Sequence, residues 1–325
     1  MKEESYLKIK IDDKKFKENL FKKKEKQIKI FLNFIIFLAL FITLFKYYNL
    51  KYNYLLKEKE NQSLNIYKKT PKIIAISYSN KLYQKQLALN KKSALEIGNV
   101  DEYYSYGPSD IDIEFKEKNI YILSQKRGNG YWLWKPYFIL KTLKEKLKNG
   151  DYLIYTDACV LYMNSTYKII EFMKERDAEM WADQLIYKEK NYTKRDTFLL
   201  LNADIPLFTN TFQYQATIQI YKKSKFTEKF LEELLYYSQD KRIITDLPNT
   251  LGKENYIGFK DHRHDQSVLS LLIKKYGLVN SNKTNLNITE SKSITLMPSI
   301  FCLYRRLKFI NYNDIRNKCI KKINK

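Results

Sequence analysis

Hydrophobic residues form one uninterrupted run near the start of the chain. Sixteen positions, from Ile30 to Phe45, carry no charge and would cover about 24 Å as an α-helix. Lysines bound the run at positions 29 and 46, and two tyrosines follow it. This pattern predicts a single short membrane span over residues 28–49. A buried core helix is one alternative, but no polar face interrupts the run. A cleaved signal peptide is another, but no small-residue cleavage site follows.

Lysines on the two sides of this run predict its orientation. Five lie between residues 22 and 29, and four lie between residues 46 and 59. The positive-inside rule therefore favours a cytosolic N-terminus, with the C-terminal part across the membrane. This is the layout of a single-pass, type II membrane protein with a signal-anchor.

Short apolar runs alternate with amphipathic stretches after residue 70. The apolar or alternating runs predict strands over residues 72–78, 100–106, 151–156 and 212–222. Apolar residues at helical spacing predict helices over residues 81–97, 131–147, 167–175, 225–237 and 265–276. Strands that alternate with helices indicate an α/β fold, in which helices cover both faces of a mostly parallel sheet. The predicted order is a basic tail (1–27), the anchor (28–49), a stem (50–70), the α/β domain (71–304) and a basic tail (305–325).

Basic residues outnumber acidic ones, 59 to 36, which gives a net charge of +23. The excess fits an anionic partner, such as nucleic acid, anionic lipid or a phosphorylated substrate. It also fits a compositional bias, because the chain is rich in Lys, Asn, Ile and Tyr and holds only 8 glycines and 6 prolines. No nucleic-acid-binding motif accompanies the charge, so we expect no nucleic-acid partner.

The three cysteines, Cys159, Cys302 and Cys319, lie far apart in the sequence. An odd number without paired spacing supports neither a disulfide scaffold nor a zinc ribbon.

Asp157 directly follows the predicted strand over residues 151–156. Ligands of open α/β sheets bind at the carboxyl ends of the strands. A carboxylate there can hold a divalent cation that neutralises charge on a leaving diphosphate. An aspartate that caps a turn after the strand is the structural alternative.

Two of the three tryptophans lie in the segment Gly-Asn-Gly-Tyr-Trp-Leu-Trp-Lys-Pro, residues 128–136. Aromatic faces beside Lys135 suit a sugar or a nucleotide diphosphate. Alternatively, the segment begins a core helix with Pro136 in its first turn. At least one of Trp132 and Trp134 then packs in the core, because positions two apart point to different faces of a helix.

Both histidines of the chain lie in the heptad Asp-His-Arg-His-Asp-Gln-Ser, residues 261–267. His264 and Asp265 can supply a metal ligand and an acid, a base or a group that orients an acceptor. The alternative is a capped helix start with Asp265 as the N-cap residue.

Together with other segments, these motifs resemble the membrane-anchored glycosyltransferases of the GT-A, or nucleotide-diphospho-sugar transferase, superfamily. The segments that carry the resemblance are residues 72–78, 130–136, 150–159, 193–198, 213–216 and 262–267. The resemblance implies a GT-A-like catalytic domain, with a mostly parallel sheet flanked by helices and preceded by the single transmembrane helix.

The resemblance also implies roles for individual residues. Asp157 matches the first acid of the Asp-x-Asp motif, which binds Mn²⁺ or Mg²⁺ and the donor diphosphate, although Cys159 stands at the third position. The metal site would then be weaker, use His264 or be absent. Asp265 would lie near the acceptor or the reacting sugar and serve as the base of an inverting enzyme, with Asp157 as a second catalytic residue. The implied donor-binding residues are Ser77, Tyr78, Arg127, Trp132, Trp134, Lys135 and Lys194, and the implied acceptor- or sugar-binding residues are Gln213, Gln215 and Gln266.

The implied reaction moves a sugar from a nucleotide-diphosphate donor to a glycan, lipid-linked or protein acceptor. Membrane lipid would be a further partner, through residues 28–49. In a eukaryotic cell the domain would lie in the Golgi or ER lumen, whereas the cytosolic sugar nucleotides of a bacterium would require the opposite orientation. Two other functions stay open: a phosphosugar transferase of surface polysaccharide synthesis, and a non-catalytic, membrane-tethered module that binds anionic ligands.

Overall fold

The structure, a computed structural model, describes residues 26, 29, 32, 33, 35, 37–53, 71–277, 300–304 and 312–323. The chain divides into a unit of residues 1–70 and a unit of residues 71–325, and each is described by itself.

The described part of the first unit is helical over residues 37–53, and its large apolar side chains between Leu32 and Tyr52 are exposed. Within the described residues, no helix combines the length and the apolar character needed to cross a membrane. Positions 28, 30, 31, 34 and 36 of the predicted span lie outside the described residues. So do most of the predicted tail 1–27 and residues 54–70 of the predicted stem.

A five-stranded sheet forms the centre of the second unit, in the order β2-β1-β3-β8-β5. These strands are β1 (Ile73–Tyr78), β2 (Glu102–Tyr106), β3 (Tyr152–Thr156), β5 (Met180–Trp181) and β8 (Ile218–Lys222). β1 pairs in parallel with β2 and β3, whereas β8 runs antiparallel to both β3 and β5. Four of the five strands therefore point the same way, which confirms the predicted α/β fold with a mostly parallel sheet.

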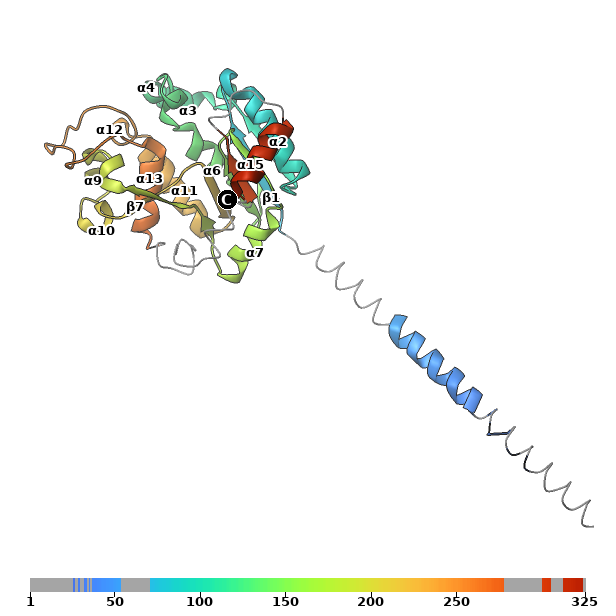
Figure 1. The fold of residues 1–325 in the computed structure, drawn as a ribbon. Helices are drawn as coiled ribbons and strands as arrows, with labels where there is room; N and C mark the ends of the chain where they lie inside the picture. The colour runs from blue at the N-terminus through green and yellow to red at the C-terminus, as the bar shows by residue number, and fades with distance from the viewer. Residues whose placement is uncertain are drawn as a thin grey trace, which may run out of the picture. The chain divides into compact units, whose positions relative to one another are not determined.

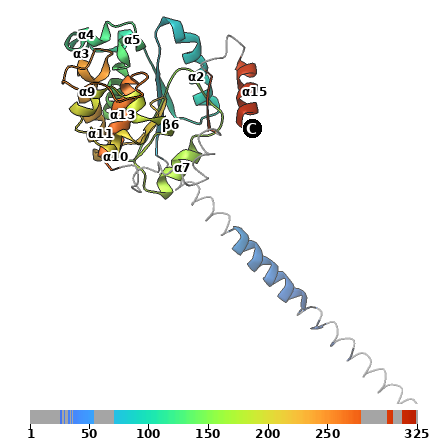
Figure 2. The same ribbon diagram turned by 60° about the vertical axis from the view of Figure 1, so that its left-hand side comes forward.

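Alternate residues of β1 face two separate hydrophobic cores. Ile74 and Ile76 pack with side chains of α6 (Trp134–Lys146), α11 (Lys225–Ser238) and α13 (His264–Lys275). Ile73 and Ala75 pack with side chains of α2 (Gln84–Glu96) and α7 (Tyr167–Glu175). The two views show α2 and α7 on one side of the sheet and α11 and α13 on the other (Figure 1, Figure 2). Because both faces are buried, β1 is apolar over its first four residues and buried along its whole length.

Shorter elements complete the second unit. They are η1 (Lys81–Tyr83), η2 (Pro108–Asp110), α3 (Ile113–Lys118), α4 (Ile120–Leu123), α5 (Gly128–Tyr131), β4 (Val160–Tyr162), β6 (Gln184–Lys188), α8 (Glu189–Tyr192), α9 (Arg195–Leu200), α10 (Pro206–Thr209), β7 (Phe212–Tyr214), α12 (Lys241–Ile244), β9 (Phe301–Leu303) and α15 (Tyr312–Ile323).

Two predicted elements differ from the structure. The single strand expected over residues 212–222 is divided into β7 and β8, and β7 pairs with β6 outside the main sheet. The helix expected from residue 131 begins only at Trp134 as α6. The preceding residues have positive φ angles, and a left-handed backbone cannot continue a right-handed helix.

A disulfide contradicts the expectation drawn from the cysteine count. Cys302 of β9 and Cys319 of α15 are bonded to each other. Ile315 and Cys319 are buried in a small cluster with Leu161 of β4. The predicted basic tail, residues 305–325, therefore includes a helix that is fixed to the domain. The two cysteines are 17 residues apart, and this spacing gives no recognisable motif.

We predict that counting free thiols before and after reduction detects this disulfide. In denaturant, protein made under oxidising conditions should show one titratable thiol, that of Cys159, and three after reduction. Alkylation followed by mass spectrometry measures both numbers. The Cys159→Ser variant is the control and should show none before reduction. Three thiols before reduction would contradict the pairing.

Candidate active site

A cavity of about 560 Å³ lies at the carboxyl ends of β1 and β3. This is the edge at which open α/β sheets bind ligands, and the volume is typical of small-molecule sites. The cavity brings together nine of the predicted site residues: Tyr78, Arg127, Trp132, Trp134, Lys135, Asp157, His264, Asp265 and Gln266. Lys126, Asp261 and Arg263 add charge to its lining.

Asp157 is held where the sequence predicts it, at the end of the buried strand β3. Its backbone N–H donates to the carbonyl of Thr217 at 2.8 Å. The hydroxyl of Tyr155 donates to its carboxylate, also at 2.8 Å. The buried Asn90 amide donates to Thr156 and Val160 on either side, which fixes the turn. The carboxylate is therefore placed by the strand and by its own hydrogen bonds.

Lys135 joins the two carboxylates of the cavity. Its Nζ lies 2.6 Å from Asp265 Oδ2 and 3.4 Å from Asp157 Oδ1. It also donates to the carbonyl of Ala216 at 3.2 Å. Lys135 comes from the first turn of α6 and Asp265 from the first turn of α13. Two motifs that lie about 130 positions apart in the sequence thus meet in one buried ion cluster.

Burial raises the pKa of Asp265 above its usual range, and the nearby ammonium of Lys135 works against that rise. Asp157 adds to the rise because a second carboxylate disfavours ionisation. A carboxylate with a raised pKa is a stronger base than an exposed one, which suits it to accept a proton.

Aromatic rings line the cavity beside these charges. Tyr78 stacks on Trp134 with ring centroids 3.8 Å apart. The indole N–H of Trp134 donates to the carbonyl of Gly128 at 2.9 Å, and Asn129 hydrogen-bonds the Tyr78 hydroxyl. Burial raises the pKa of Tyr78 to about 12, so its hydroxyl stays protonated. Trp134 is buried in the core, Trp132 is partly buried against the same core, and both line the cavity. At least one of the two tryptophans therefore packs in the core, as expected.

The backbone before α6 is left-handed over five consecutive residues, 128–132. Three of them, Asn129, Tyr131 and Trp132, are not glycine, and each such position costs roughly 1–2 kcal/mol. His264 also has a positive φ, and its ring lies against those of Tyr131 and Trp132. Backbone strain of this kind persists only where the surroundings fix it, and it concentrates at functional sites.

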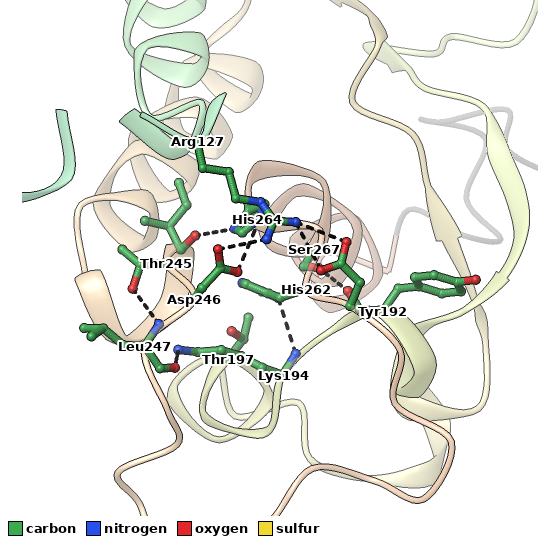
Figure 3. Close-up of polar contacts among 12 residues, drawn as sticks. Arg127, Tyr192, Lys194, Thr197, Thr245, Asp246, Leu247, His262, His264 and Ser267 are labelled. Atoms are coloured by element: carbon green, nitrogen blue, oxygen red, sulfur yellow. Dashed lines mark hydrogen bonds and ion pairs between the residues drawn. The ribbon is translucent and has the colours of Figure 1, made fainter. Parts of the chain in front are cut away.

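The two histidines line the cavity and hydrogen-bond to backbone groups of neighbouring segments (Figure 3). His262 Nε2 donates to the carbonyl of Ile243 at 2.7 Å, and its Nδ1 accepts from the backbone N–H of Lys194. His264 Nδ1 donates to the carbonyl of Ile244 at 2.8 Å. Burial lowers the pKa of both rings, most strongly that of His262, so both are neutral at pH 7.

The two expected metal ligands, Asp157 and His264, each face other side chains in the structure. His264 Nε2 faces Asp246 at 3.7 Å, and the Asp157 carboxylate is engaged by Lys135 and Tyr155. In the described part of the chain, no three His, Cys, Asp or Glu side chains are grouped so that they could hold a metal ion.

Arg127 lies at the rim of the cavity between two carboxylates. It donates to Asp246 at 2.9 Å and to both oxygens of Asp261 at 3.1 and 3.2 Å (Figure 3). This network ties the left-handed turn to the loop after α12 and to the histidine segment.

Four predicted site residues do not line the cavity. Ser77 is buried within β1. The ammonium of Lys194 donates to the carbonyl of Leu247, and burial lowers its pKa (Figure 3). Gln215 donates to Asp183 at 2.8 Å. Gln213 is fully buried and accepts a hydrogen bond from Gln266 at 2.8 Å. Gln213 therefore supports a cavity residue, whereas Lys194 and Gln215 are turned to other partners.

Sequence reasoning missed four charged residues of this region. Asp261 and Arg263 lie within the histidine heptad, so their proximity to Asp265 was a usable signal. Lys126 precedes the glycine-rich turn and offered a weaker signal. Asp246 lies in a loop with no motif, and only the fold brings it to Arg127.

Sequence comparisons assign the chain to no family. No protein-family model matches the chain. The RecBCD enzyme subunit RecB of Buchnera aphidicola subsp. Schizaphis graminum is 27% identical over 244 residues, which is 72% of this chain and 19% of that protein. The chain thus spans about a fifth of that relative, and the match establishes no family.

Solved structures that resemble the chain are glycosyltransferases. The galactosyltransferase LgtC, solved with donor and acceptor sugar analogs, is 12% identical and covers 77% of this chain and 95% of its own, with a TM-score of 0.41. Mouse xyloside xylosyltransferase 1 is 11% identical and covers 66% of this chain and 84% of its own, with a TM-score of 0.36. The Mn/GDP form of core-mannan synthase A from Aspergillus fumigatus is 12% identical and covers 63% and 70%, with a TM-score of 0.37. At TM-scores below 0.5, these likenesses decide neither the reaction nor the substrates of this chain.

We predict that Gly130→Ala destabilises the protein more than Gly150→Ala. The two glycines have similar φ angles, +98° and +95°, so the backbone strain of an added Cβ is matched. A Cβ at position 130 would meet Leu123 Cα at 2.8 Å, whereas one at position 150 meets nothing within 4 Å. We expect Gly150→Ala to cost about 1 kcal/mol and Gly130→Ala at least twice that. Thermal unfolding of both variants measures the difference, and equal losses would contradict the close packing of the turn.

Proposed function

We propose that the chain is a glycosyltransferase that moves a sugar from a nucleoside-diphosphate donor to a hydroxyl acceptor. One observation carries this proposal: stacked aromatic rings and a buried pair of carboxylates face a single cavity at the carboxyl edge of an α/β sheet. Aromatic faces suit a base or a sugar ring, and carboxylates suit sugar hydroxyls and proton transfer.

The charge of the cavity fits an anionic donor. Four cations, Lys126, Arg127, Lys135 and Arg263, line it together with three carboxylates. Arg127 and Lys135 are occupied by aspartates. The guanidinium of Arg263 instead lies over the rings of Tyr187 and Tyr192. We propose that Lys126 and Arg263 are the main cations for the diphosphate, because charge-assisted hydrogen bonds to phosphate are strong.

In this proposal the acceptor oxygen forms a bond to the anomeric carbon, and the bond from that carbon to the diphosphate oxygen breaks. The leaving oxygen takes the electron pair. In an inverting reaction the proton of the acceptor hydroxyl passes to Asp265, whose raised pKa suits it to act as the base. Gln266, fixed by Gln213, would hydrogen-bond a hydroxyl of the sugar or of the acceptor.

A panel of nucleotide sugars tests the proposal with the full chain. We expect nucleotide release from one donor, and we expect Asp157→Asn and Asp265→Asn to lower turnover by about 10²–10⁴-fold while the protein stays folded. Glu117→Gln, an exposed substitution on α3, is the matched control and should turn over like wild type. A folded protein that releases nucleotide from no donor, with or without candidate acceptors, would contradict the assignment.

We also propose that residues 28–49 anchor the chain in a membrane and that the second unit faces an oxidising compartment. The exposed apolar side chains of the N-terminal helix support the first part, because exposed apolar surface needs a cover. The Cys302–Cys319 disulfide supports the second, because disulfides persist in oxidising compartments. In a eukaryotic cell this compartment would be the ER or Golgi lumen.

Vesicle flotation tests the anchor. The full chain should float with lipid vesicles even at high salt, where attraction between lysines and lipid headgroups is screened. The double substitution Phe37→Asp and Phe41→Asp should abolish flotation, because a charge within the span is costly to bury in lipid. Equal behaviour of the two proteins would contradict the anchor.

A further inference from the structure

The glycosyltransferases that the sequence resembles imply a divalent cation, but the residues of this cavity do not fit one. Mn²⁺ and Mg²⁺ prefer several oxygen ligands at short distance. The second acid of the Asp-x-Asp motif is replaced by Cys159, which is a poor ligand for these hard cations. His264 donates its Nδ1–H to the carbonyl of Ile244, and its other ring nitrogen, Nε2, faces Asp246 at 3.7 Å. The carboxylates that remain, Asp157 and Asp265, already share the ammonium of Lys135.

We infer that Lys135 is the built-in cation of this site, and that it takes the place that a divalent metal would need between Asp157 and Asp265. This inference rests on the proposed glycosyl transfer and deepens it. It assigns diphosphate binding to side-chain cations and makes the site independent of added metal.

The position of Lys135 indicates that the residue serves function rather than stability. Its side chain is only 4% exposed, and it lies in the first turn of α6, where the helix dipole repels a positive charge. Burial and the dipole both disfavour an ammonium here. The two carboxylates offset these costs, so the three charges depend on one another. Replacing a whole buried ion cluster by apolar residues is often neutral or stabilising, so packing alone does not require these three charges.

The geometry explains why the lysine and a metal exclude each other. A divalent ion bound by both carboxylates would lie about 2.1 Å from each oxygen. The Lys135 nitrogen already lies 2.6 Å from one of these oxygens and 3.4 Å from the other. An ion held by these two oxygens would lie close to the Lys135 nitrogen, and the two positive charges would repel each other. Removing the ammonium should leave two close carboxylates, which is the minimal protein contribution to a Mg²⁺ or Mn²⁺ site.

Titration with Mn²⁺, followed by electron paramagnetic resonance, tests the inference without relying on turnover. Full-length wild type, Asp157→Asn, Lys135→Met, Lys144→Met and the double variant Lys135→Met with Asp157→Asn are compared. Met keeps the length of the lysine stem without its charge. Lys144 is the matched control, because it lies on the same helix and pairs with Glu232 and Glu228 at the surface.

We expect no site-bound Mn²⁺ in wild type or Lys144→Met. We expect about one equivalent in Lys135→Met, with affinity at least tenfold weaker in the double variant. Binding of Mn²⁺ by wild type that is lost in Asp157→Asn would overturn the inference, and so would absence of binding in a folded Lys135→Met. If Lys135→Met does not fold, the titrations of wild type and Asp157→Asn still decide the question.

Nucleotide release separates this inference from the proposed function. With an active donor, wild type should keep its turnover in EDTA to within about twofold, because Lys135 takes the place of the metal between the carboxylates and Lys126 and Arg263 bind the diphosphate. Abolished release in EDTA, restored by Mn²⁺, would overturn the inference and leave glycosyl transfer intact. Absence of release from every donor would instead contradict the proposed function, while the Mn²⁺ titrations would still test Lys135.

Discussion

The ion cluster of Lys135, Asp157 and Asp265 is the constraint around which the site is organised. Each member comes from a different element: the start of α6, the end of β3 and the start of α13. A buried charge without a partner costs roughly 3–5 kcal/mol, so removing Lys135 would expose both carboxylates to that cost, whereas removing one carboxylate leaves the lysine paired with the other. The cluster therefore fixes two helix starts against the edge of the sheet, at the place where a ligand would bind.

The residues around the ion cluster make the cavity rigid, and this rigidity comes with local backbone strain. Five left-handed residues before α6 place Trp132 on the cavity and allow Trp134 to stack on Tyr78. The two buried histidines donate to consecutive carbonyls of α12, and Arg127 binds two aspartates at the rim. These contacts keep the walls of the cavity in place before any ligand arrives, which is the arrangement that electrostatic catalysis requires.

Sequence patterns predicted the parts of this architecture that depend on local periodicity. The buried strands β1 and β3, the helices α7 and α11, and the position of Asp157 after β3 all follow from short apolar runs and helical spacing. The clustering of rare residue types also indicated the two motifs that meet at Lys135 and Asp265. The sequence could not show which way individual side chains point. His264 turns to a carbonyl of α12, and Lys194 turns to Leu247, because packing partners far away in the sequence accept their hydrogen bonds. The Cys302–Cys319 pair and Asp246 were equally hidden, since only the fold brings their partners close.

The most direct test of the central claim is a crystal structure of the full chain with its donor nucleotide sugar, grown once in EDTA and once in Mn²⁺. The account predicts the same complex in both crystals. The base or sugar should lie against Tyr78 and Trp132, the diphosphate should lie beside Lys126 and Arg263, and Lys135 should remain between Asp157 and Asp265. A manganese ion bound to Asp157, with Lys135 displaced, would contradict the claim that this lysine replaces the metal. A nucleotide bound outside the cavity would contradict the site itself.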